Sequence, residues 1–167
     1  MDIMPRVKAV SAAKLPFVLN VEWNDGSKSR VDLTGLVHSS QHFKVFADDL
    51  DAFRKVQPDE YGVGIEWANG LDYSANTLKA LADEQKPMSG KYLELFEKLL
   101  KLSTEETAHL MKVDRRTILN WRQSNKLPVA VGIAIRRFQS DPTAFAAHYR
   151  PIEAKPRGRP KQAHRER

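Results

Sequence analysis

The sequence contains no cysteine and no long apolar run, and both absences restrict what the chain can be. With no cysteine among 167 residues it can form neither disulfides nor thiolate-bound zinc sites, which suits a reducing compartment. The longest apolar stretch, from Pro128 to Ile135, is far shorter than the roughly 20 residues of a membrane-spanning helix. The first ten residues lack the apolar segment of a secretory signal. We therefore expect a cytoplasmic protein.

Sequence signals of catalysis are also scarce. The segment 62–64, Gly-Val-Gly, lacks the third glycine and the following helix of a dinucleotide-binding loop. His38 and His42 lie near Asp48 and Asp49, but no third ligand has the spacing of a metal site, and ordinary surface histidines are the simpler interpretation. We expect a protein that is not an enzyme and that has no cofactor and no metal.

The charge that is present is unevenly distributed. Residues 1–85 hold 9 Lys and Arg against 13 Asp and Glu, a net charge of −4. Residues 86–167 hold 18 against 8, a net charge of +10. This contrast predicts two modules, of which the second meets a polyanion.

The first module has the pattern of a small sheet with helices. Apolar residues alternate from Phe17 to Trp23 and again at Val63, Ile65 and Trp67, and Asn24 to Ser27 is a strong hairpin turn. Further strands are expected at 7–10 and 29–33, and a helix capped by Ser74 is expected to follow. Trp23 and Trp67 are expected in the core. We predict an α+β domain over residues 1–85.

The second module has the pattern of about five helices over residues 89–150, after a linker at 83–89 and before a basic disordered tail at 151–167. In its first helix the expected inward residues are Tyr92, Leu95, Phe96, Leu99 and Leu100, and Glu97 is expected to form an exposed pair with Lys101. A later helix, 129–138, is so apolar that we expect it to be buried. Gly132 within that helix predicts a close helix contact.

Two capped helices in this module are joined by a tight turn. Ser103 and Glu106 have the spacing of a capping box, and Asp114 can cap the next helix. A small residue, Ala108, lies where two helices must approach each other. Apolar residues that point inward follow at Val113, Ile118 and Trp121.

This arrangement resembles the helix-turn-helix of lambda-repressor-like DNA-binding domains, with 115–124 as the recognition helix. The family usually has glycine in the turn, where the backbone is left-handed, and this sequence has Lys112. The resemblance implies major-groove recognition of double-stranded DNA, and the side chains of Arg and Asn suit guanine and adenine edges. The expected DNA-binding residues are Lys112, Arg115, Arg116, Thr117, Leu119, Asn120, Arg122 and Gln123, of which Lys112 and Arg122 would contact phosphate.

The first module resembles a small, functionally uncharacterised bacterial α+β domain. The resemblance is carried by the hairpin at 18–36 and by Trp67, the Asn69-Gly70 turn, Asp72 and the helix near Leu78. Members occur alone or joined to a helix-turn-helix, and some are thought to be antitoxins. This implies an interaction or sensing domain with a toxin-like protein as a partner.

The tail contains Arg157-Gly158-Arg159-Pro160, which resembles an AT-hook. Such a peptide lies in the minor groove of A·T-rich DNA, where glycine permits close approach and the two arginines meet negative potential. A plain basic tail that raises general affinity is the alternative.

Together these patterns predict a sequence-specific DNA-binding protein that regulates transcription. The alternative is an antitoxin-like protein-binding module whose DNA binding is autoregulatory. One recognition helix reads only a few base pairs, so we expect a homodimer, formed through the sheet of the first module or through helix 129–138.

Overall fold

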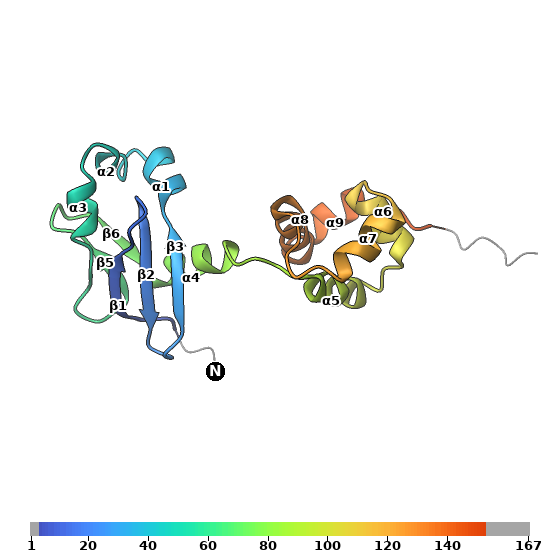
Figure 1. Cartoon of the computed structure of the whole chain (residues 1–167), viewed down its shortest axis with the longest axis horizontal. Helices are drawn as coiled ribbons and strands as arrows, with labels where there is room; N and C mark the ends of the chain where they lie inside the picture. Colours follow the sequence, from blue (N-terminus) through green and yellow to red (C-terminus); the bar gives the residue numbers. More distant parts are fainter. Residues whose placement is uncertain (1–3, 153–167) are drawn as a thin grey trace, which may run out of the picture. The chain divides into compact units, whose positions relative to one another are not determined.

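The computed structural model describes residues 4–152, and the contacts within the chain divide it into two compact units, 1–86 and 87–167. Unit 1 combines two small sheets with short helices and unit 2 is helical (Figure 1). The chain therefore has the α+β class that the sequence predicts. The predicted AT-hook, with Arg157 and Arg159, lies outside the described residues.

Unit 1 is built on an antiparallel sheet of β1 (Val7–Ala12), β2 (Val18–Trp23) and β3 (Lys28–Asp32), in that order. The Asp-Gly turn closes the β2–β3 hairpin as predicted, with Gly26 at φ 81° and the Ser27 N–H donating to Asp25 Oδ1 over 2.8 Å. The alternation along β2 sends Leu19, Val21 and Trp23 into the core. The opposite face of this sheet carries polar side chains.

The rest of unit 1 closes the core on the buried face. Helices α1 (Thr34–Ser39), α2 (Val45–Asp48) and α3 (Leu50–Arg54) precede a small sheet of β4 (Gln57–Pro58), β5 (Gly64–Glu66) and β6 (Asp72–Ser74), and α4 (Ala75–Glu84) follows. Trp67 is buried, and its Nε1 donates to Phe53 O over 2.8 Å. Trp23 is also buried, so both tryptophans lie in the core as predicted. Ser74 caps α4 as expected, accepting from Thr77 N.

Unit 2 packs five helices over its described residues: α5 (Gly90–Leu100), α6 (Thr104–Met111), α7 (Arg115–Arg122), α8 (Val129–Ser140) and α9 (Pro142–His148). Its buried core includes Leu93, Phe96, Leu110, Ile118 and Ile135. The predicted linker at 83–89 is shorter than expected because α4 continues to Glu84.

Three packing expectations for unit 2 are wrong. On α5 the expected Phe96 and Leu100 do pack into the core, but Tyr92, Leu95 and Leu99 are exposed, because Leu93 takes the inward place beside Phe96. The helix α8 is not fully buried, since Val129 is 72% and Ile133 56% exposed. Gly132 makes no close approach either: the nearest atoms to a Cβ at that position would be side-chain atoms at 3.7 Å, an ordinary contact.

Candidate nucleic-acid interface

The turn between α6 and α7 has the local structure that its sequence predicts. The Ser103 hydroxyl accepts from Glu106 N, and the Glu106 carboxylate accepts from Ser103 N, so the capping box is complete. Asp114 caps α7 by accepting from Thr117 N over 2.7 Å, and this hydrogen bond lowers the pKa of its carboxyl. Lys112 is left-handed, with φ 57° and ψ 42°, and its N–H satisfies carbonyls of the last turn of α6.

The buried face of α7 fixes the helix against the rest of unit 2. Ile118 is fully buried, Trp121 is half-buried against the same core, and Ala108 of α6 is buried beneath them. The close approach of α5 to the end of α7 requires Gly90. A Cβ there would lie 2.1 Å from the Arg122 carbonyl oxygen and 2.3 Å from that of Trp121. This glycine was not among the residues predicted to matter from the sequence.

Arg122, which was expected to contact phosphate, has an internal partner. Its Nε and Nη2 donate to the two Oε atoms of Glu97, each over 2.9 Å, and Nη2 also donates to Thr104 Oγ1. The Glu97 side chain is only 6% exposed, and the hydrogen bond to Glu97 raises the pKa of the guanidinium. A bidentate, shielded pair of this kind joins α5, α6 and α7. The predicted exposed pair of Glu97 with Lys101 is therefore wrong.

The exposed face of α7 brings three of the predicted residues together. Arg116, Asn120 and Gln123 recur at intervals of four and three residues, so they share one side of the helix, and all three are exposed. None of these three side chains forms a hydrogen bond or ion pair within residues 4–152. Leu119 borders this stripe and is half-buried. The stripe thus presents a guanidinium, two amides and the edge of an apolar side chain to solvent.

The other predicted residues lie around this stripe. Arg115 Nε is 2.7 Å from Glu105 Oε1 of α6, an exposed ion pair that the sequence analysis did not foresee. Thr117 is half-buried and supplies its N–H to the Asp114 cap. Lys112 is exposed at the turn, adjacent in sequence to the start of α7.

A second hydrogen bond fixes the start of α6 from the end of the unit. Tyr149 donates its hydroxyl to Glu106 Oε1 over 2.6 Å, while the phenol ring stacks on Phe145 at 5.0 Å between centroids. This bond, together with the bonds from Ser103, lowers the pKa of Glu106 to about 2. The capping box therefore also attaches the end of α9 to the α6–α7 pair.

Within residues 4–152 no cluster of three or more His, Asp or Glu has the arrangement of a metal site. His38 lies edge-on to Phe17, with ring centroids 5.8 Å apart. No helix in that same range is long and apolar enough to cross a membrane.

No protein-family model and no curated protein matches the chain. Among solved structures, the chain is similar to a crystal structure from Nitrosomonas europaea, of a protein described as a candidate DNA-binding protein. The two chains are 21% identical, with a TM-score of 0.45, and the alignment covers 93% of this chain and 96% of that chain.

Proposed function

We propose that unit 2 binds double-stranded DNA by inserting α7 into the major groove, and that the chain is a sequence-specific transcriptional regulator rather than an enzyme. The observation that carries this is the exposed stripe of Arg116, Asn120 and Gln123 on a helix whose other side is held by the core and by the Arg122–Glu97 pair. The major groove admits an α-helix, and side chains of these types form bidentate hydrogen bonds to guanine and adenine.

The charges around α7 support the same orientation. Lys112 at the turn can reach the phosphate backbone, which contributes affinity independently of base sequence. In this proposal Arg122 has a structural role, because contact with phosphate would remove it from a shielded carboxylate. Losing that partner would leave Glu97 buried without a counter-ion, which is costly.

A selection of bound sites from a random duplex pool tests this proposal. The full-length protein is expected to enrich a defined motif, and a variant with both Arg116→Ala and Asn120→Ala is expected to enrich none. A matched variant, Arg54→Ala, removes an exposed arginine of unit 1 and should enrich the same motif as the wild type. If the wild-type protein enriched no motif, the proposal of sequence-specific binding would be wrong.

The tail is proposed to add minor-groove contacts through Arg157 and Arg159. A deletion of residues 151–167 should then reduce affinity for sites flanked by A·T tracts more than for sites flanked by G·C tracts. An equal loss on both would support the alternative of a plain basic tail.

A further inference from the structure

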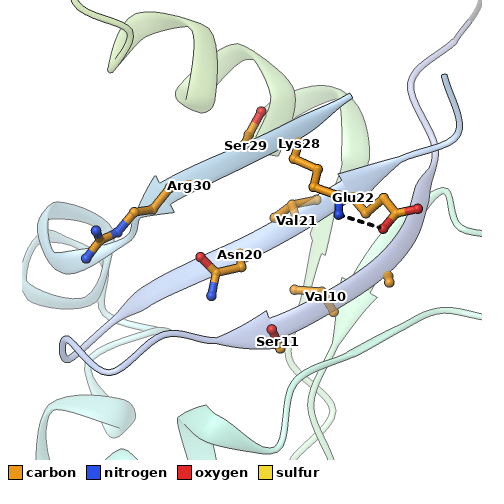
Figure 2. A pocket seen from close by; sticks show the side chains of 9 residues that line it. Val10, Ser11, Asn20, Val21, Glu22, Lys28, Ser29 and Arg30 are labelled. Carbon is orange, nitrogen blue, oxygen red and sulfur yellow. Dashed lines mark ion pairs between the residues drawn. The ribbon is translucent and has the colours of Figure 1, made fainter. Parts of the chain in front are cut away.

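The outer face of the β1–β2–β3 sheet has a hollow of about 490 Å³. The outward residues of β1 are small at Ala9 and Ser11, whereas those of β3 are long at Lys28 and Arg30, so the face is recessed on one side (Figure 2). The core of unit 1 lies against the opposite face, where Leu19, Val21 and Trp23 are buried. This sheet therefore has one face in the core and one hollowed face in solvent.

One row across the hollow consists of polar groups that have no partner. Ser11 pairs in register with Asn20, and Asn20 with Arg30, so the three side chains lie side by side across the three strands (Figure 2). Within the described part of the chain, none of these side chains forms a hydrogen bond or ion pair. The nearest carboxylate along β3 is Asp32, and its Oδ1 already accepts from Thr34 N over 2.8 Å.

In the neighbouring row the charged side chains pair with one another. Glu22 accepts from Lys8 Nζ over 2.6 Å and lies 3.7 Å from Lys28 Nζ, and these contacts lower the pKa of its carboxyl. Two cations thus flank one carboxylate and Arg30 lies in the next row, although residues 1–85 as a whole carry a net charge of −4. The hollow is a local reversal of charge within an acidic unit.

We propose that this hollow is the docking site of a short segment of a partner protein that is rich in Asp and Glu. The Arg30 guanidinium would hold a partner carboxylate through two parallel hydrogen bonds, and Asn20 Nδ2 and the Ser11 hydroxyl would donate to the same or an adjacent carboxylate. A guanidinium next to amide and hydroxyl donors matches this planar, charged acceptor.

Charge distinguishes this occupant from two others. A second copy packed face to face about a two-fold axis that crosses the three strands would bring β3 against β3, so Arg30 and Lys28 would lie against like charges, which is unfavourable. Nucleic acid would place phosphates over Glu22 and near the acidic remainder of unit 1. An acidic peptide meets the free cation of Arg30.

The test is a selection of random decapeptides, displayed on phage, against the immobilised full-length protein. The bound pool is expected to be enriched in Asp and Glu, and a labelled peptide from it should shift the amide resonances of β1, β2 and β3. Arg30→Gln should weaken that peptide at least about tenfold. Lys55→Gln removes another exposed cation of unit 1 and should change the affinity less than about twofold.

Three results would overturn the proposal. The first is a selected pool without acidic enrichment. The second is an equal loss in Arg30→Gln and Lys55→Gln, which would mean that only net charge matters. The third result concerns a short non-specific duplex added to the variant Arg116→Ala/Asn120→Ala. If the duplex displaced the peptide and shifted the same resonances of β1, β2 and β3, the occupant would be nucleic acid.

Discussion

At the scale of single residues, a glycine position determines how closely α5 approaches the end of α7. Gly90 lies where a Cβ would overlap two backbone carbonyl oxygens of α7, and backbone atoms cannot move aside cheaply. Gly90→Ala is therefore expected to destabilise unit 2 by about 2–3 kcal/mol, the cost of overpacking. The matched control is Gly132→Ala, which has room for a methyl group and should stabilise α8 by up to about 1 kcal/mol. Urea titrations followed by NMR resonances of unit 2 would measure both, and equal stability of the two variants would contradict this account.

A second residue-scale prediction concerns pH. The pKa of Glu106 in the folded chain is about 2, below the usual value near 4.5, because Tyr149 and Ser103 donate to its carboxylate. As the pH falls, Glu106 is therefore protonated in the unfolded chain at a higher pH than in the folded chain. The stabilisation is fully present above about pH 4.5 and is lost as pH falls toward 2. Tyr149→Phe should lower the melting temperature of unit 2 at pH 6, and the difference from wild type should shrink at pH 2.5. Tyr92→Phe, which alters an exposed tyrosine of α5, should have no such pH-dependent effect.

At the scale of elements, the orientation of α7 makes a prediction about DNA affinity. Arg116→Ala or Asn120→Ala should each weaken binding to the selected site by about 1–3 kcal/mol and leave non-specific binding nearly unchanged. Lys112→Ala should weaken binding to all DNA sequences alike, and the salt dependence of the affinity should fall by the amount expected for about one phosphate contact. Binding curves at several salt concentrations, on specific and random duplexes, would separate the two behaviours. The orientation would be wrong if both kinds of variant lost affinity in the same way.

The individual helices and strands also show which parts of the structure could be predicted from the sequence. The caps at Ser103 and Asp114 and the Asp-Gly hairpin were predicted because each depends on residues within one turn. The left-handed backbone at Lys112 was implied by the resemblance to a turn that usually holds glycine. The inward side of α5 was predicted only in part. Phe96 is buried as expected, but the sequence does not exclude Tyr92, Leu95 and Leu99, which have helical spacing just as Leu93 and Phe96 do. Only the packing of α7 and α8 decides between those two stripes. The sequence did contain a signal for the partner of Arg122. Glu97 follows Phe96 and lies four residues after Leu93, which places it on the buried side of α5.

At the scale of the whole molecule, the two surfaces first expected to pair, the sheet of unit 1 and helix 129–138, differ in how open they are. The β3 edge is partly closed, because the Gln85 side chain accepts from Asp32 N and donates to Asp32 O, as a neighbouring strand would. In contrast, α5 exposes Tyr92, Leu95 and Leu99, and α8, which contacts α5, exposes Val129 and Ile133. Apolar side chains gathered on one helix face are typical of an interface rather than of a free surface.

We therefore expect a homodimer that pairs through α5 and α8 and binds two half-sites about one helical turn apart, because a single α7 reads too few base pairs for a unique site. Leu95→Glu should shift the protein toward a 19.0 kDa monomer in light scattering and weaken binding to an inverted repeat far more than to a single half-site. Leu15→Glu, at a similarly exposed leucine of unit 1, is the matched control and should leave both measurements unchanged. If the wild-type protein remained a 19.0 kDa species at micromolar concentration, with and without the inverted repeat, the apolar face of α5 would not be a dimer interface.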